Sequence, residues 1–242
     1  MKKQIIGNWK MNGSTEMLKS FASSLNNQVQ IGEKAEIGVA LPYPYMSLAS
    51  HCLFSETAVK IGAQNCSTEE VGAFTGEVSV EMIRDIGANF VIVGHSERRS
   101  LYGETSDLVA VKAKQAISKG LMPIICVGES ESEREASKHL DVIKDQLKKS
   151  VPEGTFQEQY MIAYEPVWAI GTGKVASLED IKEMHDFIAF ELGFKGCPLL
   201  YGGSVKPDNA REILAIETVG GVLVGGASLK ADDFAAIYQS VA

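Results

Sequence analysis

Short apolar runs recur along the chain and determine the fold that we expect. They are rich in Val, Ile and Leu and show no alternation of polar and apolar positions, which is typical of parallel strands covered on both faces. The expected strands are residues 5–9, 37–41, 59–63, 90–93, 123–127, 160–164, 199–201 and 222–224.

The segments between these runs carry helix signals. Residues 130–133 and 177–180 fit the capping box, in which the first side chain caps a free backbone N–H and the fourth reciprocates. The glycines that stand where helices should stop are Gly87, Gly120 and Gly193. After Thr105, the stripe that should face a sheet consists of Val109, Ala113, Ala116 and Ile117.

The repeating unit is therefore a strand followed by a helix, with no linker between the repeats. We expect an α/β fold in which residues 1–242 form one domain, a single closed eight-stranded parallel β/α barrel. An open doubly wound sheet is the alternative, but such sheets usually have fewer strands. In closed barrels the loops at the C-terminal ends of the strands build the active site.

Charge and composition narrow the class of protein. The formal net charge of −8, without a dense basic cluster, argues against a nucleic-acid partner, because clustered Lys and Arg bind phosphate backbones. The N-terminal residues pass directly into the first apolar run, so we expect a cytoplasmic protein with no membrane partner. The four cysteines and four histidines lack the spacing of a disulfide scaffold or a metal site, so we expect packed thiols, no metal and no cofactor.

Charged side chains follow three of the expected strands. Lys10 follows the first strand, His95 the fourth and Glu165 the sixth. Taken singly, each has a structural or solvated explanation. Converging on one barrel mouth, they supply a cation, an imidazole and a carboxylate base, which can remove a proton next to a carbonyl and stabilise the enediolate.

These residues lie within longer strings that resemble the triosephosphate isomerase family. The strings are residues 8–12, 94–99, 163–174, 201–205 and 223–229, and they span the chain in order. The resemblance implies a TIM barrel and an enzyme of glycolysis and gluconeogenesis. It would interconvert glyceraldehyde 3-phosphate and dihydroxyacetone phosphate by proton transfer through an enediolate, with no cofactor.

The resemblance also implies catalytic roles. Glu165 would be the base that moves the proton between C1 and C2, and His95 would polarise the carbonyl oxygens. Lys10 and Asn8 would stabilise the negative charge, and Glu97 would help to hold Lys10. This family is itself the established example of a neutral catalytic imidazole whose pKa is lowered by a helix N-terminus, and the helix start expected after His95 agrees with that role.

A lid is expected after Glu165. Pro166 favours an extended conformation at Glu165 and presents the carboxylate at the rim. The lid residues implied by the family are Pro166, Val167, Trp168, Ala169, Ile170, Gly171, Thr172, Gly173, Lys174, Val175 and Ala176. The family's hinges correspond to 166–167 and 175–176, and its partners for the open and closed lid to Glu129 and Tyr201. A loop packed permanently on the barrel is the alternative.

Backbone amides must bind the phosphate, because no Arg- or Lys-rich pocket is evident among the glycines. Gly171 of the lid offers an N–H group, and Ser204 follows a glycine pair after the seventh strand. Gly225 and Gly226 follow the eighth strand and lead into a short helix start, which fits the phosphate site made by the late loops of a barrel.

The loop of residues 64–77 is longer than typical βα loops. In the family this loop reaches into a neighbouring subunit, with Phe74 within it and Thr75 close to the partner's catalytic residues. The resemblance therefore implies a homodimer, and a self-packed loop on a monomer is the alternative. Val71 is apolar where relatives are usually polar, which indicates burial.

The chain departs from the family at two positions. Ala189 and Gly220 stand where an Arg and an Asp usually form an ion pair behind the phosphate loops. Losing both partners avoids a stranded buried charge, and we expect altered rigidity around residues 201–204 with the chemistry retained. Two other functions compete, another sugar-phosphate isomerase and a catalytically silent phosphate-binding scaffold. The first would not explain the lid, and the second does not need Asn8, Lys10, His95 and Glu165 together.

Overall fold

The computed structural model describes residues 2–29, 32–171, 173–193 and 196–241. Within them the strands are β1 (Lys3–Asn8), β2 (Ala35–Leu41), β3 (Lys60–Ala63), β4 (Phe90–Val93), β5 (Met122–Val127), β6 (Met161–Tyr164), β7 (Leu199–Tyr201) and β8 (Gly221–Val224). Each strand pairs in parallel with the next, and β8 pairs with β1 to close the barrel. The closed eight-stranded barrel is confirmed, and the open sheet is excluded.

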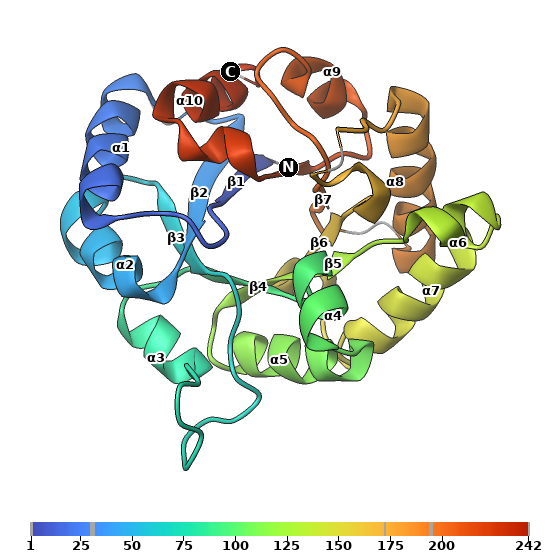
Figure 1. Cartoon of the computed structure of the whole chain (residues 1–242), viewed down its shortest axis with the longest axis horizontal. Helices are drawn as coiled ribbons and strands as arrows, with labels where there is room; N and C mark the ends of the chain where they lie inside the picture. Colours follow the sequence, from blue (N-terminus) through green and yellow to red (C-terminus); the bar gives the residue numbers. More distant parts are fainter. Residues whose placement is uncertain (1, 30–31, 172, 194–195, 242) are drawn as a thin grey trace.

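Helices form a ring around the barrel (Figure 1). The α-helices in the described residues are α1 (Thr15–Gln28), α2 (Tyr43–Leu48), α3 (Val80–Asp85), α4 (Ser96–Tyr102), α5 (Ser106–Ser118), α6 (Glu131–Glu135), α7 (His139–Ser150), α8 (Leu178–Leu192), α9 (Ala210–Ala215) and α10 (Ala231–Gln239). Short helical turns cover Ala49–Leu53, Gln157–Gln159, Val167–Ala169 and Gly226–Leu229.

The predicted helix signals are confirmed. Both capping boxes form, at Ser130 before α6 and at Ser177 before α8. Gly193 ends α8 in the left-handed conformation, with φ 69°. On α5, three members of the predicted stripe are buried and Ile117 is half-buried. The caps fix where each helix starts, and so where each loop at the barrel mouth ends.

Two apolar layers hold the fold together. The barrel interior contains Ile6, Ala40, Phe90, Ile92, Ile124, Cys126, Met161, Ala163, Leu200 and Leu223. A larger buried cluster fills the space between the strands and the helix ring. Gly62 makes room for the Phe90 ring, since a Cβ there would lie 2.2 Å from it. Three of the four cysteines are buried, and all four are free thiols.

The long loop between β3 and α3 projects from the ring (Figure 1). Residues 69–77 are all exposed, with Val71 at 86% and Phe74 at 46%. In this chain the loop is therefore not packed against its own barrel, and Val71 is not buried. None of the helices in the described ranges is long and apolar enough to cross a membrane.

Candidate active site

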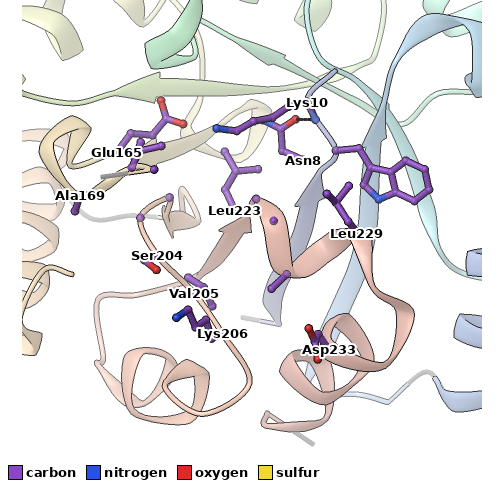
Figure 2. A pocket seen from close by; sticks show the side chains of 18 of the residues that line it. Asn8, Lys10, Glu165, Ala169, Ser204, Val205, Lys206, Leu223, Leu229 and Asp233 are labelled. Atoms are coloured by element: carbon purple, nitrogen blue, oxygen red, sulfur yellow. Dashed lines mark hydrogen bonds between the residues drawn. The ribbon is translucent and has the colours of Figure 1, made fainter. Parts of the chain in front are cut away.

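One cavity of about 670 Å³ occupies the mouth at the C-terminal ends of the strands. It brings together four predicted catalytic residues, Asn8, Lys10, His95 and Glu165, and four residues predicted to bind phosphate, Gly171, Ser204, Gly225 and Gly226. Figure 2 shows Glu165, Lys10 and Asn8 on one side of this cavity and Ser204, Val205 and Lys206 on another. Residues that are far apart in the sequence thus line the same cavity.

Lys10 is held in an unusual backbone conformation. Its φ is 52°, in the left-handed region that L-residues rarely adopt. The Asn8 side chain accepts a hydrogen bond from the Lys10 N–H at 3.0 Å, and Gln64 donates to the Lys10 carbonyl at 2.9 Å. The Lys10 ammonium contacts the Glu97 carboxylate at 2.5 Å. These contacts hold the Lys10 side chain at the mouth of the barrel, where its ammonium lies beside Glu97 as predicted.

Glu165 is almost fully buried and is held by two donors. Its Oε1 lies 2.9 Å from Nε2 of His95, and its Oε2 accepts the N–H of Ser96 at 2.8 Å. Burial alone would raise the pKa of the Glu165 carboxyl. The contact with His95 and the Ser96 N–H outweigh burial and lower that pKa, so the group is ionised. The site therefore holds a carboxylate that is ready to accept a proton.

His95 caps helix α4 with its side chain. Nδ1 accepts the backbone N–H of Glu97 at 3.2 Å, which leaves the ring proton on Nε2, facing Glu165. Burial lowers the pKa of His95, but the adjacent Glu165 carboxylate raises it, and the net direction is upward. The expected lowering of this pKa is therefore wrong for the present arrangement. The reason is the ion-pair contact with Glu165, which competes with the helix N-terminus.

The segments predicted to bind phosphate also line the cavity. Gly202, Gly203 and Ser204 follow β7, while Gly225 and Gly226 follow β8 and lead into the short helix Gly226–Leu229. Gly171 of the lid has φ 70° and also lines the cavity. Lys206 and Lys230 line its outer part. The sequence pattern gave no signal for these two lysines, because they lie beyond the glycine motifs.

The predicted lid is tied to Glu129 through its first half. Residues Val167–Ala169 form one helical turn, in which Ala169 is buried and faces the cavity. The Glu129 Oε1 atom accepts the Trp168 indole N–H at 2.8 Å and the Tyr164 hydroxyl at 3.0 Å. The Tyr201 hydroxyl is buried and has no hydrogen-bond partner among the described residues.

The other predicted residues take different positions. Ile170 lines the cavity with Ala169, whereas the following residues do not: Glu97, Glu129, Tyr201, Pro166, Val167, Trp168, Gly173, Lys174, Val175, Ala176, Phe74 and Thr75. Thr172 lies outside the described residues. Asn12 and Gln64 support the site but were not singled out. Their position just after β1 and β3 was the available signal.

A side chain at position 220 would collide with β7, and this explains the glycine there in a way that the sequence did not reveal. The Gly220 N–H donates to the Leu199 carbonyl at 2.7 Å, and a Cβ at this position would lie 2.9 Å from the Leu199 nitrogen. A single Asp at this position would therefore displace β7. The altered rigidity near residues 201–204 stays a prediction. Here α8 is instead joined to the segment before β8 by the Thr218 hydroxyl, which donates to Asp186 at 2.9 Å.

Within the described residues, no group of three or more His, Cys, Asp or Glu side chains is placed to hold a metal ion.

Comparisons with known proteins agree on one family. The sequence model described as triosephosphate isomerase matches residues 3–241. The triosephosphate isomerase of Brucella abortus is 46% identical over 245 residues, covering 98% of this chain and 95% of that protein. That of Rhizobium meliloti is 45% identical over 245 residues, with 98% and 94% covered. A crystal structure of triosephosphate isomerase from Bartonella henselae superposes with a TM-score of 0.88 at 40% identity and covers 99% of both chains.

Proposed function

Because the chain belongs to the triosephosphate isomerase family, we propose that the cavity at the barrel mouth is its active site and that Glu165 is the catalytic base. The protein is an isomerase that interconverts glyceraldehyde 3-phosphate and dihydroxyacetone phosphate. The observation that carries the assignment of the site is the placement of a buried Glu165 beside His95, in one cavity with Lys10 and the two glycine pairs.

Proton transfer requires Glu165 to exchange its present partners for the substrate. The carboxylate leaves the Ser96 N–H and His95 and takes a proton from the carbon next to the carbonyl. The electron pair of the broken C–H bond forms the enediolate. Glu165 then returns the proton to the neighbouring carbon, while the hydroxyl proton moves from one substrate oxygen to the other. Once Glu165 has turned away, burial and the Glu97 N–H at Nδ1 favour a neutral His95.

The negative charge of the enediolate is stabilised by three polar side chains. The Nε2–H of His95 donates to the substrate oxygens, and the Lys10 ammonium and the Asn8 amide lie in the same cavity. The Lys10 ammonium remains paired with Glu97. The Glu97 side chain is 44% exposed, so water screens the pair and the Lys10 charge can still act on the substrate. Lys10 therefore contributes charge, while Glu97 positions it.

Phosphate binds to the backbone N–H groups of the late loops, and the lid closes over it. Ser204, Gly225 and Gly226 line the same cavity as Glu165, and Gly171 joins them from the lid. The buried Tyr201 hydroxyl has no hydrogen-bond partner among the described residues. It can therefore form a hydrogen bond with the lid once the lid has closed. Closure excludes water and prevents the enediolate from losing phosphate.

The exposed loop of residues 69–77 fits a role in a homodimer. A self-packed loop would hide Val71 and Phe74, whereas both are exposed in the single chain. In the dimer Thr75 would approach the partner's catalytic residues. A cytoplasmic location stays a prediction.

The test of Glu165 is its replacement by Gln in purified protein. Glu165→Gln keeps the size of the side chain and removes its basicity, so kcat should fall by at least about a thousandfold. Interconversion of the two triose phosphates is measured for both proteins. An inactive wild-type protein, or a fully active Glu165→Gln variant, would overturn the assignment. A different sugar-phosphate isomerase or a silent scaffold would show no such pair of results.

A further inference from the structure

Arg134 lies outside the catalytic cavity but contacts Trp168 in the first half of the lid and Asp180 on the helix that follows the lid. It stands on α6, a helix that neighbours α8 in the ring (Figure 1). Its guanidinium carbon lies 5.3 Å from the centre of the Trp168 ring, close enough for a cation–π interaction. Its NH1 group lies 3.4 Å from Glu129, the residue that accepts the Trp168 indole N–H.

The same guanidinium reaches the helix that begins after the lid. Its NH2 group donates to Oδ1 of Asp180 and lies 3.5 Å from Glu183. The other oxygen of Asp180, Oδ2, accepts the backbone N–H of Ser177 at 3.1 Å and its hydroxyl at 2.8 Å. Ser177 follows the second hinge directly. One carboxylate therefore connects Arg134 to the C-terminal end of the lid.

The first hinge is held by Glu129, which Arg134 also contacts. The Val167 N–H donates to the backbone carbonyl of Glu129 at 3.2 Å, and the Glu129 carboxylate is completely buried. Arg134 is 20% exposed, so its contacts with Glu129 and Asp180 are partly shielded from water. A planar guanidinium can stack on an indole and donate to carboxylates at the same time, which an ammonium group cannot do as well.

We propose that Arg134 is a positioning residue for the lid, whose guanidinium joins the first hinge, through Trp168 and Glu129, to the second hinge, through Asp180 and Ser177. The two ends of the lid then move together. The inference rests on the lid assigned under the proposed function. Arg134 acts through Trp168 and Asp180 and does not line the catalytic cavity.

The experiment measures how well the closed lid retains the enediolate. If the lid closes incompletely, the enediolate expels phosphate as the C–O bond breaks and leaves methylglyoxal. The ratio of phosphate released to triose phosphate isomerised is measured for wild type and Arg134→Met, with Arg211→Met as the control. Arg211 is an exposed arginine on α9. We expect Arg134→Met to raise the ratio about tenfold, equivalent to about 1.4 kcal/mol, and Arg211→Met to leave it unchanged.

Two further variants separate coupling from a general loss of stability. Arg134→Lys keeps the charge near Trp168, so its ratio should fall between those of wild type and Arg134→Met. Asp180→Asn removes the carboxylate that Arg134 binds, and the double variant Arg134→Met/Asp180→Asn should be no worse than the more severe single variant.

A wild-type ratio in Arg134→Met, or additive effects in the double variant, would overturn the coupling role and leave Glu165 in its assigned role. Failure of the proposed function looks different, because the wild-type protein would then show no isomerase activity in the same assay. The ratio compares two fates of one intermediate, so a loss of folded protein does not change it.

Discussion

At the scale of single residues, burial decides which side chains carry charge. Glu165 is buried and ionised because two donors face it, whereas His185 is buried and faces little that would stabilise a proton. The His185 ring lies between Tyr164 and Tyr201, with ring centroids 6.0 and 6.3 Å away. Its Nε2 atom has no hydrogen-bond partner among the described residues.

The protonation of His185 should make stability depend on pH. Burial lowers the pKa of His185 from 6.5 to about 4, although the Thr218 carbonyl and Asp186 act in the opposite direction and Lys3 adds to the lowering. The unfolded chain therefore binds a proton that the folded chain excludes between these two values. The contribution of His185 to stability is complete above about pH 6.5 and is lost as pH falls towards 4. Over that range it amounts to about 3 kcal/mol.

Replacement of His185 by Asn tests this pH dependence. An Asn amide can still donate to the Thr218 carbonyl but does not titrate, so urea unfolding of His185→Asn should lose the corresponding slope between pH 6.5 and 4. His51→Gln is the control for the loss of an imidazole, because His51 is exposed. An unchanged slope in His185→Asn would show that other groups govern acid unfolding.

At the scale of secondary-structure elements, local signals were predictable and long-range contacts were not. The strands and the boxes at Ser130 and Ser177 could be predicted because each depends on neighbouring residues. Gln64 acts on Lys10, 54 positions away, and Arg134 on Asp180, 46 positions away. Nothing in the surrounding sequence marks such a pair, because the barrel alone brings the two residues together.

Part of the site could be predicted because its residues follow strand ends. Asn8, Lys10, His95 and Glu165 were found this way, and they meet because parallel strands present their C-terminal ends at one mouth. The charge of His95 could not be predicted as simply. Its pKa depends on which residue faces Nε2, and that depends on the rotamer of Glu165.

The approach of β5 to β6 at the mouth leads to a prediction about Gly128. This glycine follows β5, and a Cβ on it would lie 1.9 Å from the Glu165 carbonyl oxygen. Gly128→Ala must therefore displace the backbone that carries the base. We expect kcat to fall about a hundredfold, because a displacement on the order of 1 Å costs that much in a catalytic site.

Gly32→Ala is the matched control for Gly128→Ala. A Cβ on Gly32 would meet nothing nearer than 3.9 Å, so this variant should keep the wild-type kcat. Steady-state kinetics of both variants, with circular dichroism to confirm folding, give the comparison. Wild-type kcat in a folded Gly128→Ala protein would show that β5 and β6 can separate without moving Glu165.

At the scale of the whole molecule, the chain must attract a phosphate although its net charge is −8. The cations among the described cavity residues are Lys10, Lys206 and Lys230, and the acids are Glu165, Asp208 and Asp233. With His95 neutral, these side chains sum to no net charge. The attraction for a dianion must therefore come from oriented backbone N–H groups and from the placement of Lys10, which fits the glycine pairs of the late loops.

The projecting loop gives the prediction at this scale. Phe74 is 46% exposed in the single chain, and in a homodimer it would be covered by the partner. Phe74→Asp would then bury a carboxylate in each of two equivalent contacts, whereas in a monomer the carboxylate would stay in water. We expect the dissociation constant of the dimer to rise at least about a hundredfold, equivalent to about 2.7 kcal/mol, with activity falling as the protein is diluted.

Phe156→Asp distinguishes a dimer contact from a general effect of losing an exposed aromatic side chain. Phe156 is 72% exposed, precedes the short turn Gln157–Gln159 and is not part of the loop of residues 69–77. Sedimentation velocity should show a dimer for wild type and Phe156→Asp, and a monomer for Phe74→Asp at the same concentration. A wild-type monomer with full activity would contradict the role given to Thr75, because the catalytic residues of one chain would then be complete without a partner.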